Sequence, residues 1–446
     1  MSSKYLLIRL LTVTLFLNSF IKYTNAQETK LDWDLNQCLN YALEHNIQVN
    51  KKKLAVESSS ADYFKTKSER LPSLSASLSE SITNSKDNTS SSKDAWTLAN
   101  STSASLSSSI TIFDGGSISN RISASSLNID IANLDVEATK NNITLSITQA
   151  YLNILYAKES VDYANEVVVT SQKQVERAKE LLNAGSIARF DLVQLEAQYA
   201  SDSYSLVVAK NTLTTDITNL KQLLEITVTD TFNIKFPEVD YKGDYLILPT
   251  INDAFNTSLS IMPEIKSGEI NREVASINVK VAQAGYAPTL SLSANYSSDF
   301  SSLSSNSFSS QLSNNQMQRV GLSLSIPIFN RFSTKTTVQK SKINLKEAEL
   351  SFLETKKNLL QTVETVYQNT VAGKSRYDAA IGQHSSANES YKISEEQFNL
   401  GMLNSVDLLK AKNTLLSAQK ELVQSKYTAI LNRKILDFYM GKPITL

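Results

Sequence analysis

The sequence predicts a mainly α-helical protein with four strands of a transmembrane β-barrel, built as a duplicated repeat. The second half of the 446-residue chain follows the first at a constant offset of 216 residues, as in the pairs Leu35 and Ile251, Leu74 and Leu290, Phe113 and Phe329, and Leu220 and Leu436. Four segments alternate apolar and small polar residues, and each pair of segments precedes a long heptad pattern. An offset kept over this length indicates the same order of elements in both halves.

Residues 1–26 have the features of a secretory signal peptide. Lys4 and Arg9 flank a short apolar run, and small residues at 24 and 26 precede a predicted cleavage before Gln27. Cleavage there removes three of the 44 basic residues and none of the 44 acidic ones, so the formal net charge falls from 0 to −3. A near-neutral balance gives no electrostatic footprint for nucleic acid. No later apolar stretch is long enough for a membrane-spanning helix.

We expect two repeats joined by a linker. The first repeat covers 27–230 and the second 249–446, with residues 231–248 between them. Each repeat should contain a helix, then a β-hairpin (72–113 and 288–329), then a long helical hairpin (117–226 and 333–440).

The alternating segments are the predicted strands, at 73–83, 96–112, 289–296 and 320–328. Each carries Leu, Ile, Val or aromatic residues on one face and mostly Ser or Thr on the other, a period-two pattern typical of strands. Half-buried strands of a soluble sandwich would show the same pattern. Four such strands in a secreted and otherwise helical chain favour a barrel with lipid on one side and water on the other. Polar loops at 84–94 and 299–315 should join the strands of each hairpin.

A heptad seam runs along each long helix. The first seam alternates large and small residues at Ala150, Ile154, Ala157, Val161, Ala164, Val168, Ser171, Val175, Ala178 and Leu182. The second has Val366, Thr370, Gly373, Tyr377, Ala380, His384, Ala387, Tyr391, Ser394 and Phe398 at the matching positions. An ordinary two-stranded coiled coil would favour Leu and Ile throughout, so the small residues indicate close packing against several neighbours.

Lengths indicate how these helices combine. Helices over 117–183 and 333–400 would each be about 100 Å long at 1.5 Å per residue. The flanking helical segments, 35–70 and 188–226 in the first repeat and 251–283 and 405–440 in the second, are about half as long. Two short segments stacked end to end therefore match one long helix.

The junctions between strands and helices resemble those of the TolC family of outer-membrane efflux proteins. The stretches 109–116, ending in Phe113, Asp114, Gly115 and Gly116, and 324–331, containing Pro327 and Phe329, look like its strand-to-helix signature. Pro72 and Pro288 stand where that family enters its strands. Its helical turns have a Gly followed by Asp and Val or Leu, as at Gly185 with Asp191 and Gly401 with Asp407. The resemblance covers about 31–446.

Membership would imply a homotrimer in the cell outer membrane, in contact with outer-membrane lipid, with twelve strands closing one barrel. It would also imply a periplasmic tunnel of helices that docks a periplasmic adaptor protein and an inner-membrane RND or ABC-type pump. The expected docking turns are Gly185, Ser186 and Ile187 in one hairpin and Gly401, Met402 and Leu403 in the other. Leu403 stands where TolC has a latching arginine, and Lys410 replaces the second acid of its constriction.

The turn acids have two interpretations. Each could stabilise the first turn of its helix, where a carboxylate meets the positive end of the helix dipole, with Asn404 as the N-cap before Asp407. The resemblance instead implies a pore constriction at Asp407, with Asp191 and Lys410 nearby. Both roles can coexist.

Nothing in the sequence indicates an enzyme or a cofactor. The two histidines, His45 and His384, and the single cysteine, Cys38, fit packing positions, and no phosphate loop or metal-ligand cluster is visible. Our leading interpretation is a passive export duct, for efflux or type I secretion. The alternatives are a periplasmic adaptor, which would not need four membrane-length strands, and a trimeric coiled-coil adhesin, which would keep its strands in one block.

Overall fold

The protein is described here from a computed structural model, which covers residues 32–86, 96–227, 232–237 and 248–446. The predicted signal peptide, most of the first loop and most of the linker lie outside the described residues.

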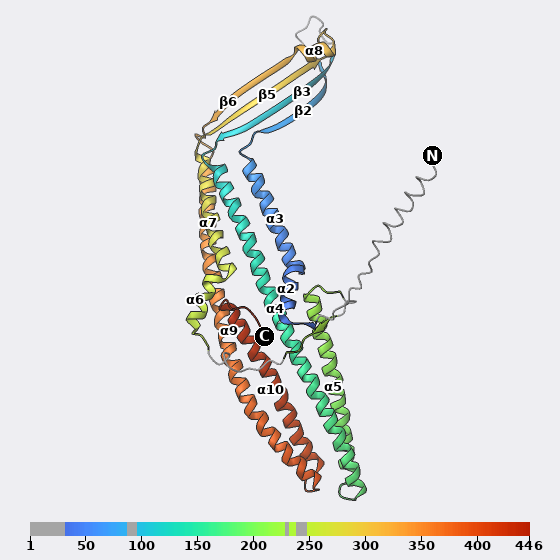
Figure 1. Cartoon of the computed structure of the whole chain (residues 1–446). Helices are drawn as coiled ribbons and strands as arrows, with labels where there is room; N and C mark the ends of the chain where they lie inside the picture. The colour runs from blue at the N-terminus through green and yellow to red at the C-terminus, as the bar shows by residue number, and fades with distance from the viewer. Residues whose placement is uncertain (1–31, 87–95, 228–231, 238–247) are drawn as a thin grey trace, which may run out of the picture.

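A four-stranded sheet stands at one end of an elongated helical bundle, and two helical turns stand at the other (Figure 1). The first repeat forms α2 (Leu35–His45), α3 (Ile47–Ser68), β2 (Ser73–Lys86), β3 (Trp96–Phe113), α4 (Ser117–Asn183) and α5 (Arg189–Leu223). The second forms α6 (Ile251–Ile261), α7 (Pro263–Gln283), β5 (Thr289–Ser301), β6 (Gln316–Ser325), α9 (Ser333–Asn399) and α10 (Ser405–Tyr439). The common order confirms the duplicated fold.

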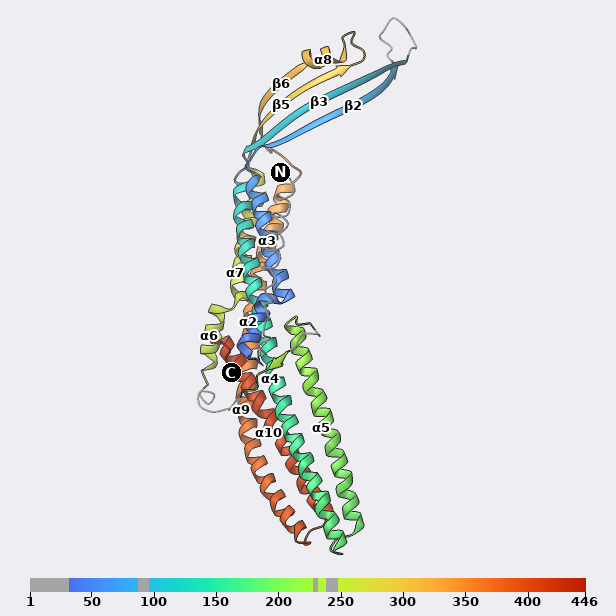
Figure 2. The ribbon, with the colours of Figure 1, turned by 45° about the vertical axis from the view of Figure 1, so that its right-hand side comes forward.

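Short helices flank each long helix, as the lengths predicted. Both α4 and α9 have 67 residues. In the turned view the pair α2 and α3 lies along the sheet-proximal half of α4, and α5 lies along its other half (Figure 2). The seam positions of α4 and α9 are all buried or half-buried. Among the described residues, no helix combines the length and the apolarity needed to span a bilayer.

The segments predicted as single helices before each strand are in fact two helices each. Asn46 ends α2 and caps α3, because its side chain accepts the backbone N–H of Gln48 at 2.9 Å. Met262 and Pro263 break the second repeat at the same place, with the proline at the first position of α7. Proline tolerates that position because its missing N–H has no helical partner there.

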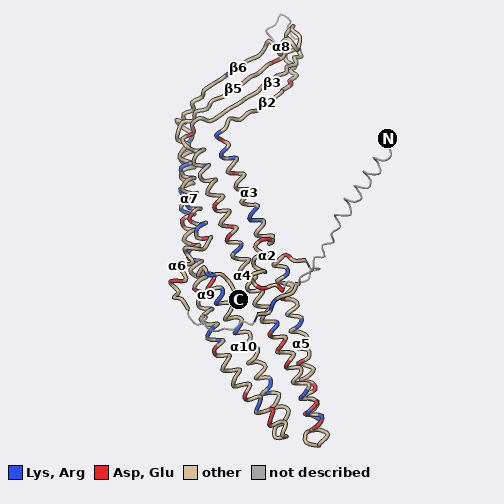
Figure 3. The backbone as a smooth tube through the Cα atoms, viewed as in Figure 1, with Lys and Arg blue, Asp and Glu red and all other residues tan. Residues whose placement is uncertain are grey.

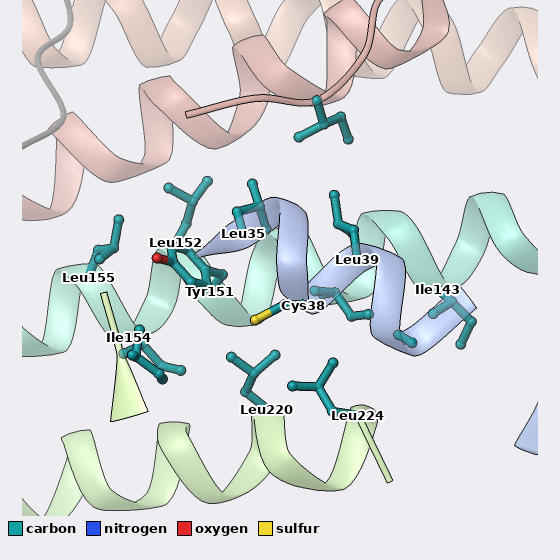
Figure 4. Packing of buried hydrophobic residues seen from close by; sticks show 14 of the residues in the cluster. Leu35, Cys38, Leu39, Ile143, Tyr151, Leu152, Ile154, Leu155, Leu220 and Leu224 are labelled. Atoms are coloured by element: carbon teal, nitrogen blue, oxygen red, sulfur yellow. The ribbon is translucent and has the colours of Figure 1, made fainter. Parts of the chain in front are cut away.

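A hydrophobic core lies near the middle of the bundle, where α2, α4 and α5 meet (Figure 4). Tyr151 is fully buried, and its hydroxyl donates to the carbonyl of Lys235 at 2.5 Å. The two-residue strand β4 (Asn233–Ile234) pairs in parallel with β1 (Asp32–Trp33) beside this core. Cys38 is also fully buried, as the sequence predicted, and burial raises the pKa of its thiol to about 12.

The sheet is antiparallel in the order β2, β3, β5, β6, so β2 and β6 are its edges. Directly opposed residues are often both serines, such as Ser77 and Ser105, whose hydroxyl oxygens are 2.7 Å apart. The opposite face carries the exposed apolar residues Leu74, Leu78, Leu106, Leu322 and Leu324. Because side chains alternate along a strand, the polar and apolar sets occupy opposite faces.

The strand bounds differ from the predicted ones. β5 continues to Ser301, five residues beyond the prediction, because its residues still pair with β6 as far as Ser298 and with β3 as far as Ser301. β6 starts earlier and ends at Ser325, because Pro327 lacks the N–H that a ladder needs. The predicted loop 299–315 contains a short helix, α8 (Phe308–Asn314), held to β5 by Gln311, whose side chain bonds both the N–H and the carbonyl of Ser301.

The junctions between β3 and α4 and between β6 and α9 use the same backbone shape with different residues. Gly115 and Gly116 have φ values of 69° and 84°, in the left-handed region. A Cβ on Gly115 would lie 2.5 Å from that of Ala287, which follows the short 3-10 helix Ala284–Tyr286 before β5. The equivalent residues, Arg331 and Phe332, have φ values of 54° and 62° despite their side chains.

Candidate functional site

The two helical turns have the same geometry. Gly185 has φ 74° and its N–H donates to the carbonyl of Leu182, while the N–H of Ser186 reaches back to Leu181. Gly401 has φ 72°, and the following N–H of Met402 reaches back to Gln397. This bonding satisfies the last carbonyls of the long helix and requires a left-handed residue, for which glycine is the usual choice.

The turn residues differ in exposure. Met402 is 73% exposed, and its neighbour Leu400 is 74% exposed. Ile187 and Leu403, two of the expected docking residues, are half-buried against a cluster that includes Phe398 and Leu408. The apolar surface available at the tips is therefore that of Met402 and Leu400, together with Phe190, Val193 and Val406 near the start of the returning helices, which are 62%, 52% and 50% exposed.

Asp191 connects the two hairpins. Its carboxylate accepts the hydroxyl of Ser405 at 2.6 Å, the N–H of Ser405 at 3.2 Å and the N–H of Ala188 at 3.2 Å. These hydrogen bonds, above all that from the Ser405 hydroxyl, hold the pKa of Asp191 below its ordinary value. Asp191 therefore caps its own helix and fastens the start of α10.

Asp407 has no such bridge among its described contacts. It is exposed, its N–H donates to the side chain of Asn404 at 2.9 Å, and the Asn404 amide donates back to its carboxylate at 2.9 Å. Asn404 is thus the N-cap of α10, as expected. Lys410, one turn further, is exposed in a groove between α5 and α10 beside Gln194 and Asn413. The structure places Asp407 and Lys410 on the same exposed end of α10, and Asp191 apart from them in contact with Ser405.

A buried ionic cluster joins three helices, and sequence reasoning missed it. Lys412 of α10 is 3% exposed and donates to Asp202 of α5 at 2.8 Å and to Ser171 of α4 at 2.6 Å. The other carboxylate oxygen of Asp202 accepts Gln198 at 2.8 Å. A buried charge needs a partner and hydrogen bonds to be tolerated. The only sequence signal was a lysine within the apolar stripe of Leu408 and Leu409.

A second polar contact joins α4 to α9. The amide of Gln174 donates to the hydroxyl of Tyr391 at 2.6 Å, and that hydroxyl donates to Glu395 at 2.8 Å. Burial, reinforced by Glu395, raises the pKa of Tyr391 above its ordinary value. Together with Asp191 and the Lys412 cluster, this contact fastens the second hairpin to the first over several helical turns.

The histidines and the potential metal ligands of the described residues do not gather in one place. No group of three or more His, Cys, Asp or Glu side chains there has the arrangement of a metal site. His45 stacks on Tyr41 with ring centroids 4.1 Å apart, and His384 is half-buried on the seam of α9. The organised polar groups instead connect helices.

The chain is thus a duplicated pair of long helical hairpins with an amphipathic antiparallel sheet at one end. The family model described as outer membrane efflux protein matches residues 38–225 and 255–442. The chain therefore belongs to the outer membrane efflux protein family, as its junction and turn residues predicted.

Known proteins of this fold are similar over most of their length. The outer membrane protein TolC of Escherichia coli (strain K12) is 24% identical over 349 residues, which are 77% of this chain and 70% of TolC. The channel protein CusC aligns with TM-score 0.77 at 20% identity, covering 95% of this chain and 96% of CusC. The CmeC outer membrane channel of Campylobacter jejuni aligns with TM-score 0.76 at 20% identity, covering 91% of this chain and 85% of CmeC.

The family fixes location and general role. The protein is an outer-membrane exit duct with a large periplasmic portion and is not an enzyme. The sheet is its membrane part and the helices its periplasmic part, so the adaptor and adhesin alternatives are wrong.

Proposed function

We propose that three copies of this chain form one duct, with a twelve-stranded barrel continued by a tunnel of helices. The observation that carries the proposal is the pair of open edges, β2 and β6. Unpaired backbone groups are not tolerated in lipid, so a four-stranded sheet needs partners on both sides. β2 and β6 run in opposite directions, so β6 of one copy can extend the antiparallel ladder of the next.

Light scattering on the detergent-solubilised protein tests this assembly. The expected mass is that of three chains, with gel mobility that changes on heating as the barrel unfolds. A monomer that keeps its β-sheet signal would contradict the proposal.

We propose further that the helical turns dock a periplasmic adaptor, which links the duct to an inner-membrane pump of the RND or ABC type for efflux or type I secretion. The exposed side chains of Met402 and Leu400 support an apolar contact there, since Met adapts its shape to a partner surface. Gly185, Ser186, Ile187, Gly401 and Leu403 shape these turns.

Exchange of Met402 for aspartate tests the docking. Met402→Asp keeps the Gly401 backbone but places a charge in the proposed contact, so export in cells should fall at least tenfold while trimer yield stays normal. The matched control is Ser205→Asp, at an exposed position of α5 away from both turns. Normal export by the Met402 variant would count against docking at this turn.

The structure also guides the choice of constriction residue. Asp191 is engaged by Ser405, whereas Asp407 is exposed near the end of its helix. We therefore propose that three copies of Asp407 line the inner mouth of the duct, with Lys410 offsetting part of their charge. Conductance measurements described in the Discussion test this assignment.

A further inference from the structure

Basic residues gather where the helices meet the sheet. In the ten residues that adjoin each strand on its helical side, at 63–72, 114–123, 279–288 and 326–335, there are seven Lys or Arg and two acids. We call the seven the basic belt, and they are Lys65, Lys67, Arg70, Arg121, Lys280, Arg331 and Lys335. All seven are exposed. Figure 3 shows Lys and Arg near the sheet at the ends of α3 and the neighbouring helices.

The end of the bundle that carries the two helical turns lacks this excess. The equivalent ten-residue windows beside the two turns, at 174–183, 189–198, 390–399 and 405–414, contain six Lys or Arg and seven acids. Of the two ends of the bundle, the end nearest the sheet is thus the one with an excess of positive charge.

The acids near the belt are already engaged. Glu69 forms an ion pair with Arg121 at 2.6 Å. Asp114 caps α4 by accepting the N–H groups of Gly116 and Ile118. Among the ion pairs of the described residues, Arg121 is the only belt member that has a carboxylate within 4.0 Å. The other six belt cations are exposed, and no carboxylate of the described residues lies within 4.0 Å of them.

Aromatic side chains are interleaved with the belt. Phe64, Tyr286, Phe329 and Phe332 are 72%, 57%, 71% and 63% exposed. The ammonium of Lys335 lies 5.7 Å from the ring centroid of Phe332, and that of Lys67 lies 5.8 Å from Tyr63. Exposed aromatics with Lys and Arg are the chemistry of a membrane interface, where the rings lie at headgroup level and the cations meet phosphates.

We propose that the basic belt binds the phosphate groups of anionic phospholipids in the membrane leaflet that faces the periplasm. The belt residues lie within ten residues of the strand ends, so a lipid whose chains pack on the apolar face of the sheet has its headgroup near the belt. Each cation near an anionic surface favours binding by about fivefold at moderate salt. The belt fixes the depth of the sheet in the bilayer and gives the duct a preference for anionic lipid.

Lipid retained by the purified full-length protein tests the proposal. The protein is exchanged into detergent with equal amounts of phosphatidylglycerol and phosphatidylcholine at 0.15 M salt, and bound lipid and oligomeric state are read from native mass spectra. The variant replaces Lys65, Lys67, Lys280 and Lys335 by glutamine. The matched control replaces Lys173, Lys357, Lys392 and Lys420, four exposed lysines far from the sheet.

Wild type and control should retain phosphatidylglycerol in clear excess, and the belt variant should lose at least tenfold of this preference while its oligomeric state is unchanged. Equal preference in belt variant and control would overturn the proposal, as would a wild type that does not discriminate between the lipids. Loss of the oligomer in the belt variant alone would also overturn it, because the belt would then be a contact between copies. Channel conductance of the same samples reports separately on the proposed duct.

Discussion

The two helical hairpins share their lengths and turn geometry but differ in what their turn acids do. α4 and α9 have 67 residues each, and α5 and α10 have 35 each. At equivalent positions, Asp191 accepts hydrogen bonds from Ser405, while Asp407 is held only by its own N-cap residue and is exposed. The same backbone geometry therefore holds a residue that connects the two hairpins in the first repeat and an exposed charge in the second.

The largest effect should come from the contact that fastens the hairpins together. Replacing Lys412 by methionine leaves the buried carboxylate of Asp202 unpaired, which should cost about 3–5 kcal/mol. The measurement is the denaturant midpoint of the purified oligomer. The double change Asp202→Leu with Lys412→Met should recover most of the loss, and Lys410→Met, at an exposed position, should be nearly neutral. An unaffected Lys412→Met protein would mean that the cluster does not hold the hairpins.

The strand-to-helix junctions should give the next largest difference between repeats. Gly115→Ala places a Cβ 2.5 Å from that of Ala287 and also strains the left-handed backbone, so it should destabilise the protein by more than about 2 kcal/mol. Arg331→Gly, at the equivalent position, relieves a left-handed non-glycine residue and should stabilise it by up to about 1 kcal/mol. The same denaturation experiment checks both variants. A change in stability of the same sign in both would contradict this account of the junctions.

A smaller, pH-dependent effect should distinguish the two turn acids. The folded-state pKa of Asp191 is below its unfolded value, so its contribution is complete above about pH 4 and is lost as pH falls through the folded pKa. Asp191→Asn should therefore flatten the fall in stability below pH 4. Asp407→Asn serves as the comparison, because the described hydrogen bonds of Asp407 join it only to Asn404, the N-cap of its own helix. If the stability of both variants depended on pH in the same way below pH 4, the proposed difference between Asp191 and Asp407 would be wrong.

Most of the fold could be predicted from the sequence because its signals are local and periodic. The 67-residue helix 117–183 and the four strands follow from heptads and alternation, and the turns follow from Gly185 and Gly401. The helix break at Asn46 was missed although an N-cap residue and, in the second repeat, Pro263 marked it. α8 was missed because a Ser- and Asn-rich segment has weak helix preference, and its fold depends on Gln311 reaching Ser301.

The candidate site was predicted less completely, because its contacts join distant parts of the chain. Ser405 lies 214 residues from Asp191, and Lys412 lies 210 residues from Asp202. No local pattern indicates which acid of the duplicated pair meets a partner, since both follow a glycine turn at equal spacing. Only the packing of one hairpin against the other distinguishes them.

Single-channel conductance in a planar bilayer tests the assignment of Asp407 most directly. Three carboxylates about 7 Å apart at an effective dielectric of about 20 repel by about 2 kcal/mol per pair, so the ring should attract cations. Wild type should be cation-selective and blocked by trivalent cations. Asp407→Ala should lose both properties, and Asp191→Ala should keep them. If Asp407→Ala changes neither the ion selectivity nor the block by trivalent cations, Asp407 only stabilises the first turn of α10 and the constriction lies elsewhere.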